Sequence, residues 1–103
     1  MNYENFSDRE KQILQKVTEI LETELHPKKI ILFGSRAKGK FRKHSDFDFA
    51  IDTVEPDNIS RRKLSEKIES ISGLYKIDIV FLENVDRDFK KIIINSGKVL
   101  YAE

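Results

Sequence analysis

The sequence predicts a small α/β domain in which short strands alternate with helices. Three stretches carry apolar residues at the spacing of an amphipathic helix. Between them lie short apolar runs of strand length, rich in isoleucine, valine and phenylalanine. The expected strands span about residues 29–33, 46–52 and 77–82. Because helices and strands alternate, we expect one sheet packed with helices. Periodicity alone leaves open whether that sheet is parallel or mixed.

The first helix is predicted from its start signal and its apolar stripe. Ser7 and Glu10 have the spacing of a capping box, in which each side chain binds the other residue's backbone amide. The stripe that follows consists of Ile13, Leu14, Val17, Ile20, Leu21 and Leu25. The pair His26–Pro27 ends this helix, because a residue before proline disfavours helical geometry.

The later elements are bounded by glycines and by polar stretches. The elements expected after the first strand are a helical turn (35–38), a basic loop (40–45), a second long helix (after Asn58), a last helix (87–95) and an edge strand (98–101). Gly73 and Gly97 end the two later helices, since glycine is the usual residue just beyond a helix C-terminus.

Composition limits the functions that the chain can have. Its 103 residues suit one domain, expected over residues 1–103. Charged residues make up 36% of the chain but the net charge is only +1, which does not favour a protein that follows long stretches of nucleic acid. The absence of cysteine excludes disulfides, thiol nucleophiles and cysteine zinc sites. No signal-peptide pattern or membrane-length apolar stretch is present, so we expect a cytoplasmic protein.

The residues with the clearest chemical meaning lie between the first two strands. Gly34–Ser35 follows the apolar run Ile30–Phe33, and ten residues separate Ser35 from Asp46. A glycine after a buried strand lets the backbone turn sharply and approach a ligand closely. Ser35 can cap the short helical turn, which leaves backbone amides facing a phosphate group. This segment therefore predicts an anion-binding turn.

Asp46 and Asp48 are spaced to bind a divalent cation. Alternate side chains of a strand share a face, so the two carboxylates point the same way, with Cα atoms roughly 6.6 Å apart. Two such carboxylates repel each other unless a cation lies between them. Hard oxygen ligands with room left for phosphate oxygens suit Mg²⁺.

The pattern Gly34–Ser35, ten residues, Asp46-x-Asp48 resembles the signature of the DNA polymerase β-like nucleotidyltransferase superfamily. The form Gly-Ser-Arg-Ala-x-Gly and the short chain most resemble its minimal members, the MNT type. The resemblance covers about residues 30–82 and extends to the tail at 94–101. It implies a small nucleotidyltransferase domain whose mixed sheet has three to four strands, with helices packed on one side. It also implies two Mg²⁺ ions and transfer of a nucleoside monophosphate from ATP or another nucleoside triphosphate.

The nucleotide-binding residues that we expect are Gly34, Ser35, Arg36 and Ser45. Gly34 and Ser35 would hold the β- and γ-phosphates through backbone amides and the Ser35 hydroxyl. The basic loop that follows would attract the nucleotide by its positive field.

Two ions need a third carboxylate, and two residues compete for this role. Asp78 lies between isoleucines in the third strand, where an acid without a partner is costly. In the family that the chain resembles, the third acid lies on a later strand in such a setting. Asp52 shares a face with Asp46 and Asp48 but lies ~13 Å beyond Asp48 along the strand. We prefer Asp78, which with Asp46 and Asp48 forms the expected catalytic and metal-binding set and can accept a proton from the acceptor hydroxyl.

The resemblance also implies a partner. MNT proteins are often encoded beside a helical HEPN protein, and in some pairs the MNT protein neutralises an RNase toxin by adding AMP to a tyrosine. We therefore expect a Mg²⁺-dependent nucleotidyltransferase that acts as an antitoxin, in a homo- or hetero-oligomer. One alternative is a non-catalytic nucleotide-binding module that neutralises its partner by complex formation. Another is nucleotide addition to RNA, against which the balanced charge counts.

Overall fold

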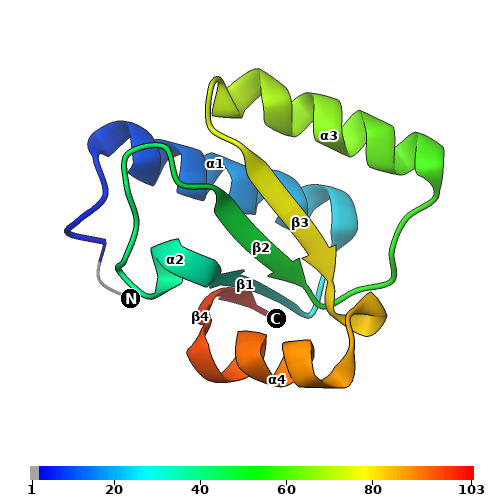
Figure 1. The fold of residues 1–103 in the computed structure, drawn as a ribbon. Coiled ribbons are helices and arrows are strands. Elements are labelled where there is room, and N and C mark those ends of the chain that lie inside the picture. Colours follow the sequence, from blue (N-terminus) through cyan, green and yellow to red (C-terminus); the bar gives the residue numbers. More distant parts are fainter. Residues whose placement is uncertain (1–2) are drawn as a thin grey trace.

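The computed structural model describes residues 3–103, which form one four-stranded sheet with helices (Figure 1). In chain order the elements are α1 (Asp8–Leu25), β1 (Lys29–Phe33), α2 (Gly34–Ala37), β2 (Phe47–Ile51), α3 (Asn58–Ser72), β3 (Ile77–Phe81), the 3-10 turn η1 (Leu82–Asn84), α4 (Arg87–Ser96) and β4 (Lys98–Ala102). Among these described residues, no helix is both long and apolar enough to cross a membrane.

The sheet is mixed, and its strand order is β3-β2-β1-β4. The central strand β1 runs antiparallel to both β2 and β4, whereas β2 and β3 run parallel. A parallel pair cannot be joined by a tight turn, and α3 supplies the long connection between these two strands. The prediction of a small α/β domain with a mixed sheet of three to four strands is confirmed.

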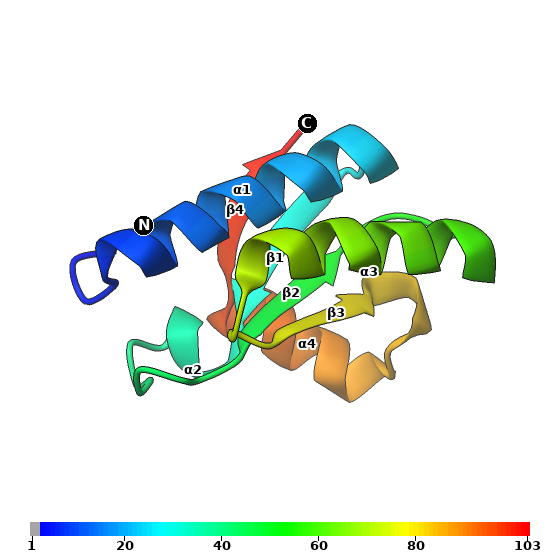
Figure 2. The ribbon, with the colours of Figure 1, turned by 90° about the horizontal axis from the view of Figure 1, so that it is seen from above.

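Helices cover both faces of the sheet. The two long helices α1 and α3 lie side by side over one face, and α4 lies against the other (Figures 1 and 2). The expectation that helices pack on one side alone was therefore wrong for α4. The reason lies in β1, where Ile30, Ile31 and Leu32 are all buried, so that both faces of this strand require apolar cover.

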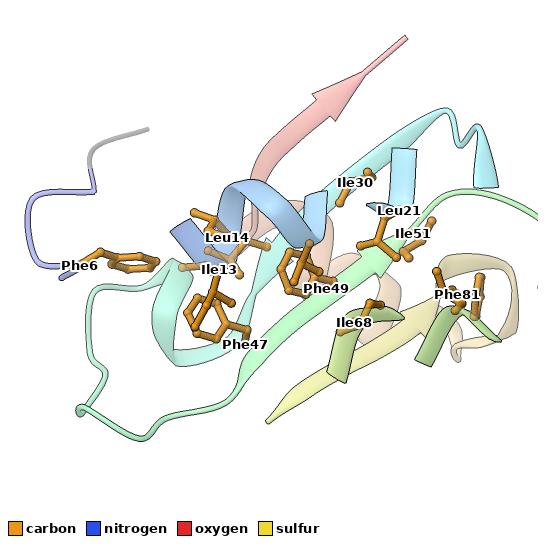
Figure 3. Packing of buried hydrophobic residues seen from close by; sticks show 14 residues of the cluster. Phe6, Ile13, Leu14, Leu21, Ile30, Phe47, Phe49, Ile51, Ile68 and Phe81 are labelled. Atoms are coloured by element: carbon orange, nitrogen blue, oxygen red, sulfur yellow. The ribbon is translucent and has the colours of Figure 1, made fainter. Parts of the chain in front are cut away.

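The main core fills the space between the sheet and the helices α1 and α3 (Figure 3). Phe47, Phe49 and Ile51 point into it from β2 and have no exposed surface. A smaller cluster on the opposite face is built from Ile31, Ala50, Leu82 and Ile93. Side chains alternate between the two faces of the sheet along β2. Asp48 therefore lies on the face opposite Phe47 and Phe49.

The ends of the long helices follow the predicted signals. Ser7 and Glu10 form the capping box at the start of α1, and His26 ends this helix in a left-handed conformation with φ of 46°. Gly73 follows α3 with φ of 60°, a value that favours glycine.

Two boundaries near the motif differ from the sequence-based expectation. β2 begins at Phe47 and not at residue 46, because the Ser45 amide first donates to the Arg42 carbonyl in a turn (3.0 Å). Asp46 therefore lies at the junction between that turn and the strand. The short helix α2 begins one residue early, at Gly34, and η1 replaces the expected last residue of the third strand.

Candidate active site

Gly34 brings the backbone turn after β1 directly against Asp48. Its φ is +74°, a value that side chains with a Cβ rarely adopt. A Cβ at this position would lie 2.4 Å from Asp48 Oδ2, well inside van der Waals contact. The glycine is thus needed for both conformation and space, and the turn and the carboxylate are neighbours.

Asp48 and Asp78 face each other across the parallel pair of strands. The register of β2 and β3 places Asp48 opposite Asp78, and the register of β1 and β2 places Phe33 opposite Asp48. The two acids therefore lie on the sheet face away from the phenylalanines of the main core. They are brought together by strand pairing, although they lie far apart along the chain.

Lys76, which the sequence analysis did not identify, lies close to both Asp46 and Asp78. Lys76 Nζ lies 3.9 Å from Asp46 Oδ2 and 3.7 Å from Asp78 Oδ1. The Asp46 and Asp78 side chains are 41% and 40% exposed, so both carboxylates are open to solvent and to a ligand. Lys76 sits where a positive charge partly offsets the repulsion between the acids.

The acidic side chains of the site influence one another's ionisation. Burial, followed by the charges of Asp78 and Asp46, raises the pKa of Asp48 from 3.8 to about 6, while Lys76 opposes the shift. A cation bound between the acids would reverse this cost, because it would favour the charged form of each carboxylate.

The donor set suits Mg²⁺, while its geometry is open. Asp46, Asp48 and Asp78 offer only carboxylate oxygens, the hard ligands that Mg²⁺ prefers. Within residues 3–103, however, no three acidic, histidine or cysteine side chains already stand at metal-ligand spacing. Lys76 lies between two of the acids. The residues therefore fit the ion by the chemistry of their oxygen donors.

Asp52, the competing third acid, lies at the opposite end of β2 from Asp46. Its amide donates to the Lys29 carbonyl, and its own carbonyl accepts from the Lys28 amide, each at 3.0 Å. These bonds hold Asp52 beside the start of β1, whereas Gly34 follows the end of that strand. The structure brings Asp78 and not Asp52 to the other acids.

Comparison with known proteins gives the family. Residues 15–103 match the family of polymerase beta nucleotidyltransferases, which is most of the chain. The chain belongs to this nucleotidyltransferase family. The probable protein adenylyltransferase MntA of Haemophilus influenzae is 39% identical over 62 residues, which are 59% of this chain and 54% of MntA, so the match spans about half of that relative.

Two further known proteins match a larger share of this chain. A putative protein adenylyltransferase of Methanocaldococcus jannaschii is 33% identical over 84 residues, which are 79% of this chain and 83% of the relative. A crystal structure of a toxin–antitoxin complex with AMP-PNP superimposes with a TM-score of 0.72 at 27% identity, covering 86% of this chain and 73% of that one.

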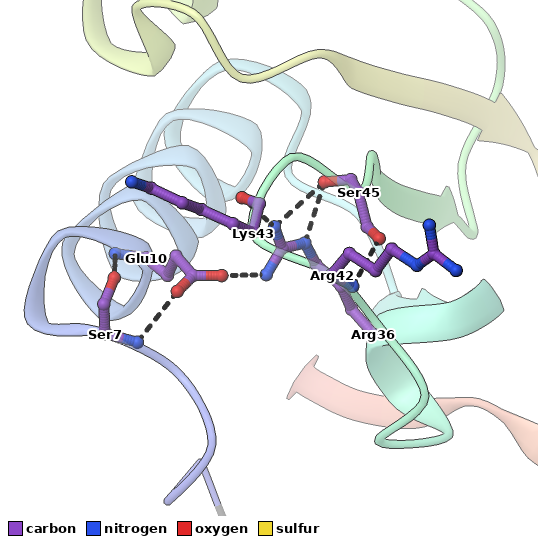
Figure 4. Close-up of polar contacts among 6 residues, drawn as sticks. All are labelled: Ser7, Glu10, Arg36, Arg42, Lys43 and Ser45. Atoms are coloured by element: carbon purple, nitrogen blue, oxygen red, sulfur yellow. Dashed lines mark hydrogen bonds and ion pairs between the residues drawn. The ribbon is translucent and has the colours of Figure 1, made fainter.

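The four residues expected at the nucleotide occupy different positions. Gly34 and the half-buried Ser35 open α2, whose first amides have no acceptor inside the helix. Ser45 Oγ accepts from the Arg42 amide at 2.8 Å, so this hydroxyl is engaged inside its own loop. Arg36 is 1% exposed and lies beneath the loop (Figure 4).

The position of Arg36 argues against the direct nucleotide contact that the sequence suggested. Its guanidinium forms an ion pair with the Glu10 carboxylate and donates to the Ser45 and Lys43 carbonyls. This role of Arg36 could not be predicted from the sequence, because the motif places Arg36 beside the predicted anion-binding turn, and only the packed fold shows which way its side chain points. The exposed basic side chains of the loop are Lys38, Lys40, Arg42 and Lys43.

Proposed function

We propose that this nucleotidyltransferase transfers AMP from ATP to a hydroxyl group of a helical HEPN-type partner, and that this modification neutralises the partner. The observation that carries the proposal is the contact of the Gly34 turn with Asp48, which itself pairs with Asp78. A glycine turn beside a carboxylate cluster is the arrangement that a nucleoside triphosphate with its metal ions requires. Both curated relatives described above are named as protein adenylyltransferases.

Asp46, Asp48 and Asp78 would hold the metal ions. Mg²⁺ bound there would neutralise the phosphate charges and orient the triphosphate. Asp48 is the central ligand, because it contacts the Gly34 turn on one side and pairs with Asp78 on the other. The neighbouring charges of Asp78 and Asp46 support this assignment, since a cation between the acids would offset their repulsion.

The phosphates would lie against the Gly34–Ser35 turn. The lack of a Cβ at Gly34 leaves the backbone open to close approach, and the first amides of α2, which have no acceptor inside the helix, would donate to phosphate oxygens. The exposed basic residues of the adjoining loop would raise the local concentration of the nucleotide. AMP-PNP, an ATP analogue, is present in the toxin–antitoxin structure that this chain resembles.

The transfer step exchanges one phosphorus–oxygen bond for another. The acceptor hydroxyl oxygen bonds to the α-phosphorus, the bond from that phosphorus to the β-bridging oxygen breaks, and pyrophosphate leaves. The hydroxyl proton passes to Asp78, whose carboxylate is 40% exposed and stands at the edge strand of the sheet, where an acceptor can approach.

The acceptor is proposed to be a protein. α4 presents Ile92 and Ile94 to solvent at 56% and 55% exposure. α4 lies on the sheet face that carries Asp48 and Asp78. A protein partner that packs on these isoleucines would bring its own hydroxyl group to the site.

Radiolabel placed on different phosphates of ATP tests the proposal. The chain is incubated with the helical HEPN-type protein proposed as its partner and with Mg²⁺. Label at the α-phosphate should appear on the partner, and label at the γ-phosphate should not. Transfer from the γ-phosphate would indicate a kinase. A stable complex without label from either position would overturn the proposal in favour of a module that neutralises by binding alone.

A further inference from the structure

Arg36 is fully buried, yet its charge and its donors are satisfied (Figure 4). Nη1 forms an ion pair with the Glu10 carboxylate. Nε and Nη2 both donate to the Ser45 carbonyl, at 3.0 and 2.9 Å, and Nη2 also reaches the Lys43 carbonyl at 3.5 Å. The planar guanidinium therefore joins α1 on one side to the end of the basic loop on the other.

Aromatic rings enclose the same guanidinium. The Phe47 ring centre lies 4.0 Å from Arg36 Cζ, and the rings of Phe41, Phe6 and Tyr75 lie at 4.7, 5.4 and 5.7 Å. Ring faces attract a cation, and their bulk excludes water from the carbonyl contacts. The position of the guanidinium is thus determined from every side.

Glu10 anchors the contact to α1. The Ser7 amide donates to Glu10 Oε1 at 2.9 Å as part of the capping box, so this carboxylate is held by Ser7 as well as by Arg36. Burial opposes the charged form of Glu10, but hydrogen bonds from Ser7 and Arg36 outweigh it, so the pKa of Glu10 lies below its usual value. Glu10 is therefore a charged and stationary partner for Arg36.

The residues that Arg36 holds flank Asp46 on both sides. Arg36 binds the carbonyl of Ser45, which precedes Asp46, and packs on the ring of Phe47, which follows it. Arg36 itself stands in α2, next to Ser35. One buried side chain thus connects the anion-binding turn to the loop end that carries Asp46.

We propose that Arg36 is a positioning residue for the transfer reaction: it fixes Asp46 relative to the Gly34–Ser35 turn without contacting the nucleotide. The effect of Arg36 on the reaction rate rests on the proposed function. Its effect on the position of the loop rests on the observed contacts alone. Only arginine fits this role, because its rigid fork can bind the carboxylate and the carbonyl together, whereas lysine offers a single flexible ammonium.

The test separates positioning from stability with a double variant. Arg36→Met leaves the Glu10 charge buried without a partner and should lower the melting temperature strongly. Adding Glu10→Gln removes that charge and keeps an acceptor for the Ser7 amide. The double variant should therefore regain most of the lost stability, while the Ser45 carbonyl still lacks the hydrogen bonds from residue 36. Arg61→Met is the matched control, since Arg61 also pairs with a glutamate (Glu55) and approaches a ring (Phe81) but lies far more exposed.

Two measurements are made on the folded variants at a temperature well below melting. Limited trypsin digestion, mapped by mass, should cut after Lys40, Arg42 and Lys43 several-fold faster in the double variant than in wild type, because the loop is released. With ATP, Mg²⁺ and the partner, kcat should fall about 10- to 100-fold while KM for ATP changes little. Arg61→Met should match wild type in both.

The outcomes are distinct. The positioning role would be overturned by a double variant that is stably folded and keeps wild-type trypsin resistance or wild-type kcat. Faster loop cleavage with lowered kcat would support it. If wild type itself transfers nothing, the proposed function fails, and trypsin alone then decides whether Arg36 holds the loop.

Discussion

Asp48 lies at the point where a strand, a glycine turn and a second acid meet. It lies in the strand β2, it touches the glycine turn that follows β1, and it faces a second acid across the strand pair. Burial comes first among the causes that raise its pKa to about 6, and the neighbouring carboxylates follow. The fold thus accepts an electrostatic cost at this residue in the absence of a cation.

Replacing Asp48 should reveal that cost as a pH dependence. The pKa of Asp48 is 3.8 in the unfolded chain and about 6 in the folded one, so the folded protein binds more protons between about pH 4 and pH 6. Wild-type stability without metal should therefore fall as pH rises through this window. Asp48→Asn should lack this fall and be more stable by about 1 kcal/mol at pH 8, after allowance for partial exposure.

Thermal melts in a chelating buffer from pH 4 to 8 measure this difference, with Asp52→Asn as the control in the same strand region. The same Asp48→Asn chain should transfer no AMP. Parallel stability profiles for Asp48→Asn and wild type would show that Asp48 is not the electrostatically strained acid.

The sequence contained enough to predict some of these residues and not others. Gly34, Asp46 and Asp48 were predicted because short-range spacing along one turn and one strand defines them. Lys76 and the internal role of Arg36 were not, because each depends on which distant groups the fold brings near. The Arg36 side chain could point toward the Gly34–Ser35 turn or into the protein, and only its packing against Glu10 and the aromatic rings decides between the two.

At the scale of elements, β1 and the connections that follow it organise the site. β1 ends at Phe33, Gly34 turns the chain, and β2 returns antiparallel so that Phe33 pairs with Asp48. After α4, the strand β4 pairs with the edge of β1 that β2 leaves open, and Gly97 connects α4 to β4. Capping signals predicted the helix limits well, whereas the start of β2 depended on a turn that the sequence did not reveal.

Gly97 is required for space at the junction of α4 and β4. Its φ of −77° suits any residue, but a Cβ there would lie 2.4 Å from Ile31 Cγ2 and 2.5 Å from the Ile93 carbonyl oxygen. Gly97→Ala should therefore destabilise the protein by about 1–3 kcal/mol through overpacking. Denaturant titration measures this change, with the exposed neighbour Lys98→Ala as the control. A loss no greater than that of the control would mean that α4 shifts freely and that the junction is not tightly packed.

At the scale of the whole molecule, sheet topology brings together the acids of the proposed site. Asp48 and Asp78 stand thirty positions apart in the sequence and become neighbours only because α3 returns the chain to a strand parallel to β2. Hydrophobic periodicity predicted both strands but not their pairing, since it reports the buried face of a strand and not its neighbour. The preference for Asp78 over Asp52 came from the apolar residues around Asp78 and from the family resemblance, and strand register now accounts for it.

The central claim is that this topology assembles a nucleotidyl-transfer site from Asp46, Asp48 and Asp78. It is tested most directly by the rate at which α-labelled ATP modifies the partner, compared between Asp78→Ala and Asp52→Ala. Asp78→Ala should abolish transfer, because it removes a metal ligand and the proton acceptor, while Asp52→Ala should retain most of the wild-type rate. Transfer that survives Asp78→Ala, or that is lost in Asp52→Ala, would contradict the account.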